Sequence, residues 1–278
     1  MTTPVVARDI ISILDAYANT EQGKTVENAR DLNYWGFSYG TVLGQTFAST
    51  YPDRVGRFAL DGVADAEDYY SQRLFATSIY TDAVVDKFFE YCFRAGSKLC
   101  PFSTGNSSLD IKTRFTDLFD RFDVKRAYEE KWDNATILEN ALGIMLTTLR
   151  PLTYTPSIGF PQMAKLLLAY EGALSNLTLE NVQIASQISS PATEDIPGVV
   201  PGLAEWTPAV FCSEAMNLFN TTIVDYEETI DVLRHQSYIG HVGWTSLKML
   251  CSGWGIEGRW KFKGTINQLL MPLTGTCD

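Results

Sequence analysis

The chain has 278 residues, 45% of them hydrophobic, which is enough to bury a core as one large domain or as a core with an insertion. Its net charge of -11 and isoelectric point near 4.7 argue against a nucleic-acid backbone or an anionic membrane surface as a partner, because both would be repelled. No stretch approaches the ~18 consecutive apolar residues of a membrane span.

The first 53 residues predict a helix, a strand, a tight turn and a second helix. Residues 5–17 have helical spacing, and a polar link then leads to a strand at 32–37. Gly36, Ser38 and Gly40 form a Gly-x-Ser-x-Gly turn before a helix over 41–49, which is typical of a nucleophile elbow. Such a turn leaves no room for a Cβ at either glycine and exposes the serine hydroxyl. The alternative is a serine in an ordinary glycine-rich turn between a strand and a helix.

The rest of the chain predicts a helical insertion between two pieces of a parallel sheet. A second strand at 55–60 ends at Asp61-Gly62, so the chain alternates helix and strand up to Val63. Helical patterns then follow at 82–93, 108–122, 136–148, 160–174 and 226–235, with a proline- and serine-rich loop at 189–208. A last apolar run at 268–273 predicts a strand that delivers Asp278. We therefore expect a core segment at 1–63, a helical cap at 64–251 and a return to the core at 252–278.

Cysteines and glycosylation acceptors indicate an oxidising, secretory compartment. Several pairings of the five cysteines are possible, and spacing favours Cys92 with Cys100 and Cys212 with Cys251, leaving Cys277 unpaired. The alternative is five reduced thiols. Acceptor asparagines with the Asn-x-Ser/Thr pattern stand at Asn106, Asn134, Asn176 and Asn220. Since the chain opens into a helix with no signal peptide, we expect that the natural amino terminus of this secreted protein is missing.

Several motifs together resemble the α/β-hydrolase fold, and specifically the secreted tripeptidyl-aminopeptidase-like serine hydrolases, which are related to prolyl aminopeptidases. They are Tyr34 to Thr41, Tyr51 to Arg57, Leu60 to Val63, Ala209 to Glu214, Cys251 to Trp254 and Leu270 to Asp278. The resemblance implies an α/β class with a partial hydrolase sheet, a large helical cap insertion and a chain truncated at both ends.

The resemblance also implies a serine, an acid and a histidine in that chain order. Ser38 matches the nucleophile, Asp278 matches the acid, and the backbone N–H of Tyr39 matches one oxyanion donor. Asp61 and Asp65 are rivals for the acid. The family's histidine lies beyond the end of this chain, and His235 and His241 precede the acid. We therefore expect the parent protein to be an enzyme and this chain to be inactive or nearly so.

In resembling peptidases, cap carboxylates hold the free α-amino group of a peptide. Glu214 is the first candidate here and Glu205 the second. Cap aromatics such as Phe211 and Trp244 would also suit a secreted esterase or lipase, and a non-catalytic binding module is a third interpretation. The partner we expect is therefore a peptide or ester substrate; the oligomeric state stays open. The histidines and cysteines have no metal-ligand spacing, so neither a metal nor a cofactor is predicted.

Overall fold

The computed structural model describes residues 2–187, 206–214 and 218–263. These residues divide into two compact units, which we describe separately. Within the described ranges, unit 1 contains 2–77, 206–214, 218–229 and 246–263, and unit 2 contains 78–187 and 230–245. The described chain is mostly helical with one small parallel sheet, which is consistent with a partial α/β architecture. None of its helices combines the length and the apolarity needed to cross a bilayer.

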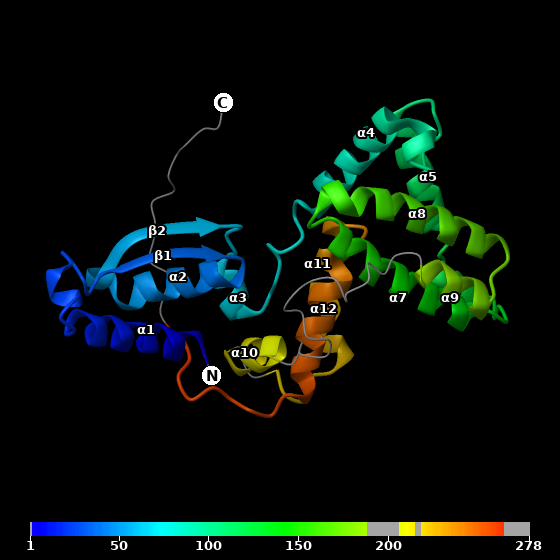
Figure 1. The fold of residues 1–278 in the computed structure, drawn as a ribbon. Helices are drawn as coiled ribbons and strands as arrows, with labels where there is room; N and C mark the ends of the chain where they lie inside the picture. The colour runs from blue at the N-terminus through cyan, green and yellow to red at the C-terminus, as the bar shows by residue number, and fades with distance from the viewer. Residues whose placement is uncertain (1, 188–205, 215–217, 264–278) are drawn as a thin grey trace. The chain divides into compact units, whose positions relative to one another are not determined.

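Unit 1 contains a two-stranded parallel sheet with helices on one face (Figure 1). Strand β1 (Leu32–Phe37) pairs with β2 (Val55–Asp61), so that Gly36 lies opposite Leu60. Helices α1 (Thr3–Ala18) and α2 (Tyr39–Thr50) pack together, and α2 contacts both strands. The predicted order of helix, strand, helix and strand is therefore present, and the carboxyl ends of the two parallel strands lie next to each other, with α2 starting directly after β1.

The other face of this sheet exposes aromatic side chains. Trp35 is 68% exposed and Phe37 is 55% exposed, and their ring centroids are 5.1 Å apart. Alternation along a strand explains this arrangement, because residues two apart share a face while Tyr34 and Gly36 face α2.

Later segments of the chain also pack within unit 1. They include α10 (Trp206–Glu214) and the short 3₁₀ turns η4 (Ile223–Tyr226) and η5 (Cys251–Gly253). A Cys212–Cys251 disulfide joins α10 to η5, and the indole N–H of Trp254 donates to the Ser213 hydroxyl at 3.0 Å. The hydroxyl of Thr2 donates to the Trp260 carbonyl at 2.6 Å. Helix α10, η5 and the segment around Trp260 therefore belong to the same compact unit as residues 2–77. The predicted domain boundaries stay a prediction.

Three further short elements occur among the described residues of unit 1. Helix α3 (Ala66–Ser71) follows β2, and the 3₁₀ turns η1 (Gly23–Thr25) and η2 (Pro52–Arg54) precede the two strands. Helices α11 (Glu227–Gln236) and α12 (His241–Leu250) each begin in one unit and end in the other.

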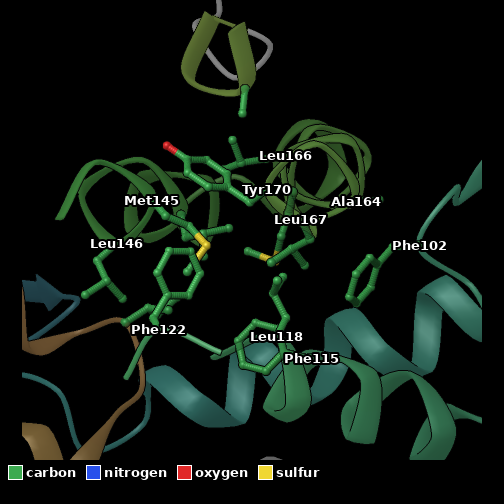
Figure 2. Close-up of a cluster of buried hydrophobic side chains, with 14 of the residues drawn as sticks. Phe102, Phe115, Leu118, Phe122, Met145, Leu146, Ala164, Leu166, Leu167 and Tyr170 are labelled. Carbon is green, nitrogen blue, oxygen red and sulfur yellow. The ribbon is translucent and has the colours of Figure 1, made fainter. Parts of the chain in front are cut away.

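The described part of unit 2 is a helical assembly around an aromatic and aliphatic core. Its helices are α4 (Thr81–Leu99), α5 (Ser108–Asp120), α6 (Val124–Glu129), α7 (Ala135–Leu152), α8 (Pro156–Ser175) and α9 (Leu179–Gln187). Figure 2 shows how Phe115, Met145, Leu167 and Tyr170 converge between these helices, and each is at most 1% exposed. Helix α4 kinks at Gly96, whose φ of 69° favours glycine, and a Cys92–Cys100 disulfide spans the kink. Both disulfides join the pairs that the cysteine spacing favours.

Candidate active site

Ser38 lies in the turn between the carboxyl end of β1 and the start of α2. Its backbone has φ 50° and ψ -122°, a conformation that non-glycine residues rarely adopt, and its side chain is exposed. Its N–H donates to the carbonyl oxygen of Asp61 at 3.2 Å, which ties the turn to the end of β2. A strained, exposed serine between a strand and a helix is the local geometry of a nucleophile elbow.

The two flanking glycines are required by close backbone packing across the turn. A Cβ on Gly36 would lie 2.7 Å from the carbonyl oxygen of Gly40 and 2.5 Å from Cε1 of Tyr34. The Tyr34 hydroxyl donates to that same Gly40 carbonyl at 2.7 Å. A Cβ on Gly40 would in turn lie 3.1 Å from the Tyr34 hydroxyl. Tyr34 therefore packs directly against the turn, and its side chain fits there only because Gly36 and Gly40 lack a Cβ.

Tyr39, the residue after Ser38, connects the turn to a buried carboxylate. Its hydroxyl lies 2.6 Å from Oγ1 of Thr3, and the backbone N–H of Thr3 donates to Oε1 of Glu214. The hydroxyl of Tyr69 donates to Oε2 of the same carboxylate at 3.0 Å, and the Tyr69 and Tyr39 rings are 6.1 Å apart. Glu214, only 4% exposed at the end of α10, is thus brought into one polar cluster with the neighbour of Ser38.

Burial controls the protonation of this cluster. It raises the pKa of Glu214, and the hydrogen bonds from Thr3 and Tyr69 oppose the rise. It also raises the pKa of Tyr39 to about 12, helped by the charge of Glu214 and opposed by the bond to Thr3. The pKa of Tyr69 rises further for the same two reasons, burial first. Both phenols therefore stay protonated at neutral pH and remain hydrogen-bond donors.

Tyr39 is also the first residue of α2. The N–H groups in the first turn of a helix have no acceptor within the helix. The Tyr39 N–H, adjacent to Ser38, thus belongs to the positive end of the α2 dipole, which favours a developing oxyanion nearby.

The predicted acids fall in different places. Asp61 is the last residue of β2, lies opposite Phe37 and is exposed. Its backbone carbonyl accepts the hydrogen bond from the Ser38 N–H. Asp65 caps α3, since its side chain accepts from the N–H of Asp68 at 2.9 Å. Asp278 and Glu205 lie outside the described residues, as do Cys277 and the strand predicted at 268–273. Asp278 as the triad acid therefore stays a prediction.

Both histidines belong to unit 2, whereas Ser38 belongs to unit 1. His235 is exposed, with Nδ1 2.7 Å from the Asp231 carbonyl oxygen. His241 is half-buried, with Nδ1 3.3 Å from the Ser237 carbonyl oxygen, and burial lowers its pKa. Each imidazole contacts the preceding turn of its own segment, as expected for histidines with a local structural role.

Sequence reasoning missed two members of the polar cluster, Thr3 and Tyr69, and the neighbouring Tyr70, whose ring centroid is 5.3 Å from that of Tyr69. Thr3 and Tyr69 contact Glu214 directly, and Tyr70 shares a 2.8 Å hydrogen bond with Thr46 of α2. These contacts join residues up to 211 positions apart. The only local sequence feature that could have indicated this cluster is the Tyr69-Tyr70 pair after the second strand, and that pair does not reveal which residues the two hydroxyls contact.

The turn at Ser38 has the backbone geometry that its sequence pattern predicts, and a short stretch of similarity to known proteins suggests at most a hydrolase of the peptidase type. Tripeptidyl aminopeptidases of Streptomyces lividans and Streptomyces coelicolor are each 38% identical to this chain over 65 residues. The match covers 23% of this chain and 10% of each relative, so it spans about a tenth of the relatives' length. No family model and no solved structure matches the chain.

Proposed function

We propose that Ser38 is the nucleophile of a secreted serine peptidase that releases short peptides from free amino termini. The observation that carries the proposal is the strained, exposed position of Ser38 between β1 and α2. The likeness to two tripeptidyl aminopeptidases supports the peptidase type.

The chemistry follows from an exposed serine at a helix start. A base removes the Ser38 hydroxyl proton while Oγ bonds to the scissile carbonyl carbon, and the Tyr39 N–H stabilises the resulting oxyanion. The intermediate then collapses to an acyl-enzyme as the protonated base gives its proton to the leaving amine. Water, activated by the same base, releases the acyl group and restores the serine. Both histidines of this chain precede Asp278, against the chain order of serine, acid and histidine, so we expect the base to come from elsewhere in a longer protein, with Asp278 as its orienting acid.

Glu214 is our candidate for holding the substrate ammonium group. Its carboxylate is buried, belongs to the same unit as Ser38 and already accepts bonds from Thr3 and Tyr69. An ionised carboxylate has about four acceptor positions, so capacity for an ammonium remains. A buried charge pair of this kind would restrict cleavage to peptides with a free amino end.

Hydrolysis assays test the proposal on a longer protein that includes residues 1–278. We expect it to cleave a tripeptide arylamide with a free amino end, and the N-acetylated form far more slowly. Ser38→Ala should abolish turnover, while Ser12→Ala, a matched change at an exposed serine of α1, should leave it unchanged. Glu214→Gln should raise KM more than it lowers kcat. Preference for short acyl esters without an amino group would instead indicate an esterase, and turnover that survives Ser38→Ala would refute the assignment.

Secretion is part of the proposal, supported by the two disulfides and by the positions of the glycosylation acceptors. Asn106, Asn176 and Asn220 are exposed, whereas Asn134 is half-buried at the start of α7. In a eukaryotic secretory host we expect glycans at the three exposed asparagines. Peptide mass spectrometry before and after glycosidase treatment measures this occupancy.

A further inference from the structure

Unit 2 contains an apolar cavity that the proposed hydrolase chemistry does not use. Its volume is about 700 Å³, and it lies between the second half of α4 and the first turns of α8. Pockets that bind small molecules typically measure about 300–1,000 Å³. The cavity therefore has the size of a ligand site, and all of its lining residues belong to one unit.

The cavity has a buried floor and an exposed rim. Phe88 and Phe160 meet edge to face with centroids 5.6 Å apart, and both are at most 9% exposed. The Cys92–Cys100 disulfide lies among the same lining residues and is also buried. Leu99, by contrast, is 72% exposed. A cavity with a buried floor differs from a flat apolar patch, because a ligand inside it is shielded from water on several sides.

Covalent constraints make this hollow largely pre-formed. The disulfide closes the chain over the kink at Gly96, so the end of α4 is tied back onto its own helix. Pro156 and Pro161 fix the backbone on the α8 side, where α8 begins. A cavity whose walls are already ordered imposes little ordering cost on a ligand.

The lining also specifies the chemistry of the occupant. None of its side chains is charged, and hydroxyls occur only on Tyr91 and Ser157. A charged group would therefore lose its hydration without gaining an ionic partner. Aromatic and aliphatic walls instead favour an alkyl chain.

We propose that this cavity is a binding site for an uncharged alkyl chain, such as the acyl portion of a neutral lipid. The residues that line it belong to unit 2, whereas Ser38 belongs to unit 1, and the proposal does not depend on the proposed hydrolase activity. The alkyl chain enters between α4 and α8 and lies against Phe88 and Phe160, and its polar end remains at the rim.

Straight-chain alcohols provide the probe, used with the full 278-residue chain. Dissociation constants for 1-butanol, 1-hexanol and 1-octanol are measured from ¹³C-methyl spectra, in which Ala95 and Leu99 report binding at the rim. Burial of each methylene is expected to strengthen binding about fourfold. Hexane-1,6-diol should bind at least about tenfold more weakly than 1-hexanol, because its second hydroxyl enters an apolar interior.

A matched pair of substitutions on α4 localises the site. Ala95 lines the cavity and is exposed, so Ala95→Trp fills the hollow without disturbing buried packing. Ala83 is also exposed on α4 but does not line the cavity, so Ala83→Trp is the control. We expect Ala95→Trp to weaken 1-octanol binding at least about tenfold and Ala83→Trp to leave it unchanged, with circular dichroism showing that both variants fold.

Three results would overturn the proposal. One is an affinity that does not depend on chain length, and another is methyl shifts remote from α4 and α8 with none at Ala95 or Leu99. The third is self-association of the chain that Ala95→Trp abolishes, which would make the hollow an interface between copies. The alcohol series uses the unmodified chain, so it decides the matter even if Ala95→Trp fails to fold.

Discussion

Substituting Gly36 with alanine tests the physical basis of the elbow. The new Cβ would lie 2.7 Å from the Gly40 carbonyl oxygen and 2.5 Å from Tyr34 Cε1, so the backbone or the tyrosine must shift. Overpacking in a buried position costs about 1–3 kcal/mol. Displacing Tyr34 also breaks its 2.7 Å hydrogen bond to Gly40, which costs about 1 kcal/mol more. We expect Gly36→Ala to destabilise unit 1 by about 2–4 kcal/mol.

Hydrogen exchange of the α2 amides measures this loss without interference from unit 2. The expected destabilisation corresponds to exchange about 30- to 700-fold faster when opening is local. Gly172→Ala is the matched control in α8, because a Cβ there meets nothing within 4 Å and alanine favours a helix interior. If Gly36→Ala changes exchange in α2 no more than Gly172→Ala does in α8, the packing argument for the elbow is wrong.

Three further predictions concern strain, protonation and cross-linking. Ser38→Gly should stabilise unit 1 by about 1 kcal/mol, since glycine adopts a φ of 50° without strain, and Ser38→Ala should show no such gain in α2 exchange. Because the pKa of Glu214 is raised, the folded state binds its proton more tightly than the unfolded state does. The stabilisation by protonated Glu214 is therefore fully present below about pH 4.5 and is lost as the pH rises through the folded-state pKa. The melting temperature of Glu214→Gln relative to wild type should therefore increase from pH 4 to pH 8, and a constant difference would contradict the assignment. Removing the Cys212–Cys251 bridge by double serine substitution should cost about 4 kcal/mol in urea unfolding and removing Cys92–Cys100 about 2.5 kcal/mol, because the bridges span 39 and 8 residues.

Local pattern predicted the segment around the elbow closely. The strand expected at 32–37 is β1, and the strand expected at 55–60 is β2 with one more residue. Strand-forming aromatics, a glycine-flanked turn and a Tyr-Pro stop all indicate the same structure here. When several local signals favour the same secondary structure, tertiary contacts rarely change it.

Elsewhere, the extent of helices was predicted less well because local signals conflict. The described part of α10, Trp206–Glu214, starts inside the segment interpreted as a loop, because the proline at position 208 signals a break in the sequence. Helix α4 continues past the predicted end at 93 to Leu99 across the Gly96 kink. The Cys92–Cys100 disulfide, whose cysteines are eight residues apart, constrains the end of this helix, and the spacing of apolar residues does not reveal that constraint.

The grouping of helices into units could not be predicted from the sequence. The Cys212–Cys251 disulfide joins α10 to η5, and the side-chain amide of Gln72 donates to the Phe211 carbonyl at 3.1 Å, so both segments group with residues 2–77. Glu214 was singled out by its sequence context, yet its hydrogen-bond partners Thr3 and Tyr69 depend on that long-range packing. Periodicity identifies which face of a helix is buried, and it does not identify the segment that covers it.

Labelling with a fluorophosphonate probe tests the central claim most directly, because the probe bonds covalently to activated serine hydroxyls. We expect a longer protein containing residues 1–278 to be labelled at Ser38, as mapped by peptide mass spectrometry, and its Ser38→Ala variant to be unlabelled. The 278-residue chain alone should remain unlabelled, since both of its histidines precede Asp278, against the expected chain order of serine, acid and histidine. Absence of label at Ser38 in the longer protein would contradict the account, and labelling at another serine would move the nucleophile away from the elbow.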